Sequence, residues 1–284
     1  MRTIMPYLIL CRVLIALFSA CSAATGFLLA ASAPAAAVLM TAAGVFLLAC
    51  GASALNQYQE RDLDALMERT KRRPLPAGIL SPRRALVVSV ILVLAGTAVL
   101  SFRGSASALL GMLAVLWYNG LYTPLKRRTA FAALYGAPVG MMPPALGWVA
   151  GGGSLADPGL WVLAALFFLW QVPHFWLLLL ENSDEYQQAG LPTLTSVVPR
   201  DRLAGISVVW IAATATAAMA LPLFGLLRDP LLFLVLVLAG IVMTLSAFVV
   251  RRRNAGWLAT VTVVDAYLFV LLLLLSTDVL VRKP

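Results

Sequence analysis

The sequence predicts an all-α fold, a polytopic bundle of about nine helices that cross a membrane. Hydrophobic residues make up 62% of the 284 positions, and charged residues make up only 12%. The mean hydropathy of +0.93 lies far above that of soluble domains. Apolar residues also gather in runs of about 20, the length that a helix needs to cross the hydrocarbon core. Together these observations exclude a soluble globular domain.

The predicted spans follow one another along the chain, separated by short polar breaks. The first segment is too long, and its flanks carry too little positive charge, for a cleaved signal peptide, so we expect it to be the first span. Arg103-Gly104 divides the third segment from the fourth, and Arg228-Asp229-Pro230 divides the seventh from the eighth. The predicted spans are residues 7–30, 36–56, 85–101, 105–122, 131–150, 159–181, 204–226, 230–250 and 257–277. Residues 1–284 are expected to form a single domain.

The basic residues lie mainly on one side of the predicted bundle. Most of the 21 Lys and Arg residues fall near the N-terminus or in four loops, 60–84, 123–130, 182–203 and 251–256. Because positively charged loops stay in the cytoplasm, we expect the N-terminus and these loops to be cytoplasmic. After an odd number of spans, the C-terminus is expected outside. The net charge of +9 then reflects topology and contact with anionic lipids of the bilayer, and we expect no nucleic-acid binding.

A polar cluster follows the second predicted span. Asn56, Glu60 and Asp64 are four residues apart, so on a helix they share one face. Amide and carboxylate oxygens at that spacing suit a hard cation such as Mg²⁺, which in turn holds a phosphate group. Asp62 points to the other side of the helix, and we expect it to orient the loop by pairing with a nearby cation, which is Arg61, Arg69 or Lys126.

Several further blocks of residues accompany this cluster. They read Met67-x-Arg69-Thr70-x-x-Arg73-Pro74-Leu75-x-x-Gly78, Tyr122-Thr123-x-Leu125-Lys126-Arg127-x-Thr129, Gly140-x-x-Pro143-Pro144-x-x-Gly147-Trp148, Trp170-Gln171-x-Pro173-His174-Phe175-Trp176 and Asp184-Glu185-Tyr186-x-x-Ala189-Gly190-x-Pro192. Together with the polar cluster, they resemble the UbiA-type intramembrane prenyltransferases. The block around His174 resembles the branch that makes haem O. One departure is Glu60, where members of the family usually have the shorter Asp.

The resemblance implies transfer of a farnesyl group from farnesyl diphosphate to a vinyl group of haem B, with addition of water, to give haem O and diphosphate. Two Mg²⁺ ions would bridge the diphosphate, one held by Asn56, Glu60 and Asp64, and the other by Asp184 and Glu185. The cations expected to neutralise the leaving group are Arg69, Arg73, Lys126 and Arg127. The residues expected to contact the substrates are Asp62, Tyr122, His174, Trp176 and Tyr186. The resemblance also implies a bacterial-type inner membrane, and contact with haem A synthase or with terminal oxidase assembly.

Two residues within predicted spans allow two interpretations each. His174, the one histidine of the chain, is either a hydrogen-bonded core residue or a contact to haem, as an axial ligand or through a propionate. Asp265 is either functional, as an intramembrane carboxylate often is, or hydrogen-bonded to Thr260 or Thr262 of its own helix.

The alternative functions differ in class. A UbiA-type enzyme that uses an aromatic or quinone-precursor acceptor fits the metal motif equally well, but it does not account for the block around His174. A transporter or channel predicts charged residues along the middle of several spans, and Asp265 is the one that qualifies.

Overall fold

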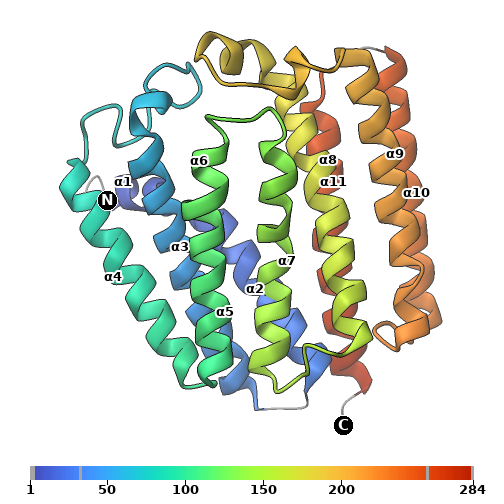
Figure 1. The fold of residues 1–284 in the computed structure, drawn as a ribbon. Helices are drawn as coiled ribbons and strands as arrows, with labels where there is room; N and C mark the ends of the chain where they lie inside the picture. Colours follow the sequence, from blue (N-terminus) through green and yellow to red (C-terminus); the bar gives the residue numbers. More distant parts are fainter. Residues whose placement is uncertain (1–3, 32–33, 254–255, 283–284) are drawn as a thin grey trace.

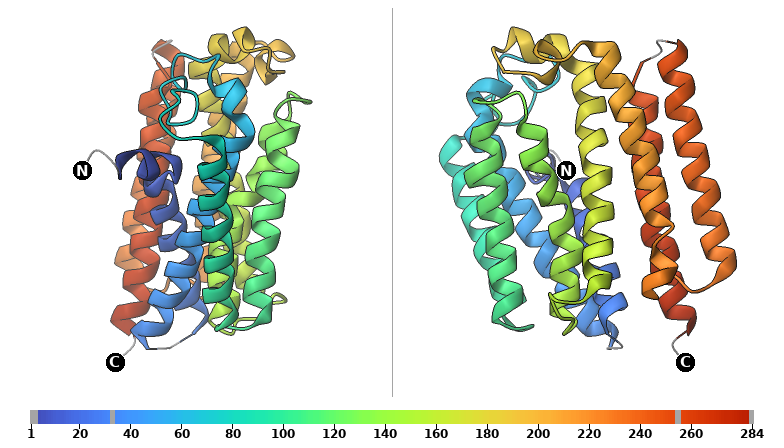
Figure 2. Two further views of the ribbon diagram at one scale, coloured as in Figure 1. Left: turned by 90° about the vertical axis from the view of Figure 1, so that its left-hand side faces the viewer. Right: turned by 45° about the vertical axis from the view of Figure 1, so that its right-hand side comes forward.

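The computed structural model describes residues 4–31, 34–253 and 256–282. Within these ranges the regular structure is entirely helical, so the all-α prediction is confirmed. In the three views of Figures 1 and 2, the long helices run roughly parallel or antiparallel and form one bundle.

Eight helical segments of the described chain are long and apolar enough to cross a membrane. They are α2 (Val13–Ala30), α3 (Ala35–Asp64), α4 (Pro82–Ser101), α5 (Ser105–Val115) continued by η1 (Leu116–Tyr122) and α6 (Thr123–Leu125), α8 (Pro158–Gln188), α9 (Arg200–Ala218) continued through η3 (Leu221–Phe224), α10 (Pro230–Arg253) and α11 (Leu258–Arg282). A ninth helix, α7 (Ala132–Ala150), lies among them (Figure 1) but is less apolar, because prolines and glycines interrupt its apolar residues. The nine predicted spans correspond to these segments.

Two predicted boundaries differ from the structure. The segment 7–30 is not one helix, because a short helix α1 (Met5–Leu10) ends before Arg12, whose backbone is left-handed with φ 46° and ψ 54°. L-residues seldom adopt that conformation, so the chain turns sharply there before α2 begins. The second span, predicted to end at residue 56, continues as α3 to Asp64. The polar cluster is therefore carried on a continuous helix.

The helices close on themselves because the first and last long helices meet. Helices α2, α3, α4 and α5 pack side by side in chain order. Helix α7 packs against α2, α5 and α8, and α11 packs against both α8 and α2. The α2–α7 contact is unusually close. A Cβ atom on Gly26 would lie 2.0 Å from the carbonyl oxygen of Pro144, and one on Gly147 would lie 1.8 Å from that of Ala23. Small residues allow such backbone approach between membrane helices.

The loops that were predicted to be cytoplasmic share one end of the bundle. The segments between α3 and α4, between α6 and α7, and between α8 and α9 all lie at the upper end in Figure 1, where α10 also ends and α11 begins. The C-terminal end of α11 lies at the opposite end. Residues 254–255 of the fourth loop, the basic Lys283 and residues 1–3 lie outside the described ranges.

Candidate active site

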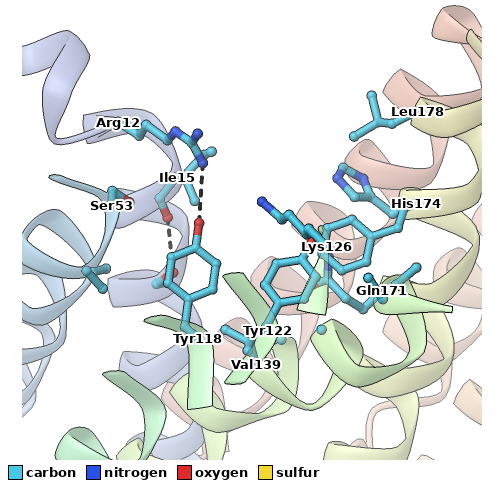
Figure 3. A pocket seen from close by; sticks show the side chains of 18 of the residues that line it. Arg12, Ile15, Ser53, Tyr118, Tyr122, Lys126, Val139, Gln171, His174 and Leu178 are labelled. Carbon is cyan, nitrogen blue, oxygen red and sulfur yellow. Dashed lines mark hydrogen bonds between the residues drawn. The ribbon is translucent and has the colours of Figure 1, made fainter. Parts of the chain in front are cut away.

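A cavity of about 790 Å³ lies inside the bundle, below the loops that share one end. Its wall comes from α2, α3, α5, η1, α7, α8 and α11, and from the loops that follow α3, α6 and α8. Charged side chains gather at the loop end, and they are Arg12, Glu60, Asp64, Arg69, Arg73 and Lys126. Apolar and aromatic side chains line the part between the helices, including Leu48, Val115, Val139, Leu146, Phe167 and Leu178. Figure 3 shows the middle of this cavity.

The two predicted ligand carboxylates are buried, and each is paired with a predicted cation. Glu60 and Asp64 expose only 5% and 2% of their surface. Lys126 Nζ donates to Glu60 Oε1 at 2.9 Å. Arg73 Nη1 donates to both carboxylate oxygens of Asp64, at 2.8 and 2.7 Å. Buried carboxylates need such partners, because desolvation of an unpaired charge is costly.

Asn56 has the third oxygen of the predicted metal face. Its Nδ2 donates to Thr123 Oγ1 at 3.0 Å, while its buried Oδ1 has no hydrogen-bond partner in the described part of the chain. An unsatisfied buried amide oxygen one turn before Glu60 fits a ligand for a hard cation, and so do the carboxylates of Glu60 and Asp64. Asn56 itself does not line the cavity. No three His, Cys, Asp or Glu side chains of the described residues form a metal cluster by themselves, so a diphosphate would have to supply further oxygens.

A π-helical turn in the fourth span sets the position of Lys126. The segment η1 ends at Tyr122, and such turns are frequent at functional sites. The Tyr122 ring packs against Gly136, where an added Cβ would lie only 2.6 Å away, and it stacks on Phe175 with centroids 5.7 Å apart. Lys126 Nζ lies 4.7 Å from the centroid of the Tyr122 ring, a cation–π distance.

Lys126 remains charged in this setting. Burial alone would lower the pKa of its ammonium group, but the neighbouring Tyr122 and Glu60 side chains raise it, and the net pKa lies above the ordinary lysine value.

Arg12 is a site residue that sequence reasoning missed. The left-handed turn before α2 directs its guanidinium into the cavity, where Nη1 donates to Tyr118 Oη at 3.4 Å (Figure 3). The signal in the sequence is a lone arginine inside a long apolar run.

The second acidic segment covers the cavity from the side of α8. Helix α8 bends at Asn182 (φ −113°, ψ 20°), and Tyr186 Oη then accepts a hydrogen bond from Arg69 Nη2 at 3.2 Å. Tyr186 lines the cavity, but Asp184 and Glu185 do not. The Asp184 side chain is 75% exposed and lies 3.5 Å from Arg200 Nη1. The buried Oε2 of Glu185 has no hydrogen-bond partner among the described residues.

His174 and Asp265 meet in the wall of the cavity. Nδ1 of His174 on α8 lies 2.7 Å from Oδ1 of Asp265 on α11. The interpretation that Asp265 bonds to threonines of its own helix is therefore wrong. Thr262 instead donates to the carbonyl of Leu258, and Thr260 Oγ1 is buried without a hydrogen-bond partner in the described chain.

The remaining predicted residues lie outside the cavity wall. Trp176 is buried against Trp210, with ring centroids 5.6 Å apart. Arg127 donates to the carbonyl of Gln59 at 3.0 Å. The Asp62 side chain is 76% exposed, and its partner is Arg61 at 3.7 Å, which was one of the three expected cations.

Comparison with known proteins identifies the family. A model of the UbiA prenyltransferase family matches residues 16–276. The chain belongs to this family. It is 44% identical to a protoheme IX farnesyltransferase of Geobacter sulfurreducens over 78% of this chain and 82% of that protein. It is 39% identical to a protein of the same name from Oleidesulfovibrio alaskensis, over 93% of each.

Solved structures of the family share the fold at low sequence identity. A digeranylgeranylglyceryl phosphate synthase superposes with a TM-score of 0.76 at 14% identity, covering 98% of this chain and 99% of the other. A UbiA homologue of Aeropyrum pernix gives 0.74 at 22% identity, with 91% and 98% coverage. A UbiA homologue of Archaeoglobus fulgidus, bound to GPP and Mg²⁺, gives 0.69 at 15% identity, with 95% and 99% coverage.

Proposed function

We propose that this family member transfers a farnesyl group from farnesyl diphosphate to a vinyl group of haem B, adds water, and releases haem O and diphosphate. One observation carries the proposal. The cavity joins a buried, charged end to an apolar and aromatic chamber. The name of the similar relatives, protoheme IX farnesyltransferase, supports the same reaction. A charged head with an apolar tail fits that division of the cavity.

The charged end is suited to the diphosphate. Asn56, Glu60 and Asp64 would hold one Mg²⁺, and Asp184 and Glu185 a second, once the diphosphate supplies oxygens between them. Bound Mg²⁺ would neutralise charge on the leaving group. In the structure Glu60 and Asp64 pair with Lys126 and Arg73, so binding of the substrate would exchange these partners. Lys126 and Arg73 would turn to the phosphate oxygens, and bound Mg²⁺ would compensate both carboxylates.

Further cations and hydrogen-bond donors surround the same end. Arg69 lines the cavity beside Tyr186, and Arg12, on the turn before α2, lines it as well. Preorganised positive groups aimed at the leaving oxygen stabilise the transition state, in which negative charge builds up on the diphosphate. Arg127 contributes from outside the wall, because its bond to the carbonyl of Gln59 ties the segment after α6 to α3, while Asp62 pairs with the neighbouring Arg61.

The reaction then proceeds in the apolar part. The allylic C–O bond breaks, and the diphosphate keeps the electron pair. The π electrons of the haem vinyl group form the new C–C bond with the farnesyl cation, and water adds to the resulting carbocation and loses a proton. The rings of Tyr118, Tyr122 and Phe175 adjoin one another there and suit the stabilisation of a cation shielded from bulk water.

The acceptor is expected beside His174. Its ring lies in the cavity wall next to Trp170, with centroids 5.1 Å apart, and an imidazole is a common axial ligand of haem iron. Trp176, buried against Trp210, acts by supporting this part of α8. The basic loops would lie at the cytoplasmic face of a bacterial inner membrane, with the C-terminus outside. Contact with haem A synthase or oxidase assembly stays a prediction.

The test is conversion by the purified protein in lipid nanodiscs. With farnesyl diphosphate, haem B and Mg²⁺, we expect haem O, separated by reverse-phase chromatography and identified by mass, together with released diphosphate. Omission of Mg²⁺ with chelator present is expected to stop the reaction. Prenylation of an aromatic acid or quinone precursor, with haem B left unchanged, would overturn the haem assignment in favour of the alternative acceptor.

A further inference from the structure

The His174–Asp265 pair joins two helices that are far apart in sequence, at membrane depth. The two residues are 91 positions apart, on α8 and α11, and both line the cavity. Placing a carboxylate inside a membrane span is costly, so such residues usually serve a site or pair with a specific partner. Asp265 does both, because it faces the chamber and contacts His174.

A second carboxylate of α11 shows what a purely structural role looks like in this chain. The side chain of Asp278 is completely buried, accepts the backbone N–H groups of Arg228 and Asp229, and forms an ion pair with Arg282. It fixes the turn before α10. The Asp265 side chain is 43% exposed, and its hydrogen bond within the described residues is to His174. Asp265 therefore does not stabilise backbone ends as Asp278 does.

The contact between Asp265 and His174 determines which nitrogen of the imidazole can act. When Nδ1–H donates to the carboxylate, the neutral ring carries no proton on Nε2. Within the described residues Nε2 has no protein hydrogen-bond partner, and it is not sealed from the cavity. Trp170 and Phe175 pack beside the ring, with centroids 5.1 and 5.8 Å away, and restrict its rotation. The lone pair of Nε2 is thus left for a ligand in the chamber.

We propose that Asp265 is a positioning residue for the acceptor, which holds His174 in the tautomer and orientation that let Nε2 ligate the porphyrin iron of haem B. The proposal rests on the proposed function. Carboxylates that accept the second N–H of a ligating histidine orient the ring and raise its basicity, and losing them costs about 10- to 100-fold in metal affinity or activity.

Four variants of the full chain in nanodiscs test this with ferric haem B (haemin) as the probe. We expect Asp265→Ala to weaken haemin binding about 10- to 100-fold. Asp265→Asn keeps an acceptor oxygen without the charge, so an intermediate loss is expected. Asp265→Glu should restore most of the affinity. His174→Ala should abolish the Soret shift and the electron paramagnetic resonance signal of a histidine-ligated ferric haem.

A second measurement separates positioning from simple stability. Without the negative charge of Asp265, the imidazole of His174 is less basic and stabilises ferric iron less. Asp265→Asn is therefore expected to lower the ratio of ferric to ferrous haem affinity. A tenfold fall in that ratio raises the midpoint potential by 59 mV. Two matched controls lie on the same helix. Thr262→Val, at an exposed position of α11, should change nothing, and Asp278→Asn should lower thermal stability without changing haem affinity or spectrum.

The outcomes distinguish the two proposals. If the wild-type protein makes haem O but Asp265→Ala and Asp265→Asn bind haemin with unchanged affinity, spectrum and potential, the positioning role is wrong and the function stands. If Asp278→Asn reproduces every effect of Asp265→Asn, the effects are general destabilisation and the positioning role is also wrong. If the wild-type protein neither ligates haemin through His174 nor makes haem O, the proposed function itself fails.

Discussion

The chain carries two acidic clusters, Glu60 with Asp64 on α3 and Asp184 with Glu185 on α8, and the structure places them in different surroundings. The first, on α3, is buried and each carboxylate is held by a cation from another segment. The second follows the bend in α8, and Asp184 is largely exposed beside Arg200. Spacing along a helix determines which residues share a face, but not how deeply that face is buried. The carboxylates of the first cluster are therefore buried and paired within the protein, whereas the carboxylate of Asp184 in the second is open to its surroundings.

The largest expected effect is at Asp64. Asp64→Ala removes a buried carboxylate that we propose as a Mg²⁺ ligand, and the diphosphate charge would then be uncompensated. Turnover should fall on the order of a thousandfold or more, which corresponds to a loss of several kcal/mol of transition-state stabilisation. Haem O formation measures this. Glu68→Ala, an exposed carboxylate in the following loop that pairs with Lys71, is the matched control and should keep full activity. Activity of Asp64→Ala within tenfold of wild type would contradict the metal assignment.

Substitutions at Glu60 test a second carboxylate of the first cluster. Glu60→Gln removes the charge that pairs with Lys126 and would hold Mg²⁺, and a loss of roughly a hundredfold in kcat/KM is expected. Glu60→Asp keeps the charge and should retain most of the activity. Equal activity in wild type, Asp and Gln variants would show that Glu60 is not a ligand.

The second cluster should respond more weakly. Asp184→Asn is expected to lower kcat/KM about tenfold at most, chiefly through a higher KM for farnesyl diphosphate, because the exposed carboxylate is not yet in place. Steady-state kinetics at several Mg²⁺ concentrations measure the effect. A loss as large as that of Asp64→Ala would mean that the two clusters act as one preformed site, and the contrast between them would disappear.

The smallest effect is expected at Tyr186, where the segment after the second cluster contacts Arg69 of the loop after α3. Tyr186→Phe removes the hydroxyl that accepts from Arg69 Nη2, a partly exposed contact worth about 1 kcal/mol, so activity should fall roughly two- to tenfold. The melting temperature in nanodiscs should stay unchanged. A large loss of thermal stability would instead indicate that this contact holds the loop after α8 in the folded protein.

Much of this arrangement could be predicted from the sequence because it depends on local periodicity. Apolar runs predicted the spans, and four-residue spacing predicted the common face of Asn56, Glu60 and Asp64. The break at Arg12 could not be predicted, because a left-handed residue depends on tertiary contacts, such as those of α1 with α3, and not on its neighbours in sequence. The His174–Asp265 pair was missed for a related reason. Contacts between helices 91 residues apart depend on which faces meet, and periodicity within one helix does not contain that information.

The ion pairs of the first cluster also have a consequence for insertion and folding of the protein. Glu60 and Asp64 are neutralised by Lys126 and Arg73, which belong to the same chain, so the acidic face of α3 can be buried during membrane insertion without help from an ion. A zinc finger, in contrast, stays unfolded until its metal arrives. We therefore expect the protein to insert and fold at a rate that does not depend on the magnesium supply of the cell.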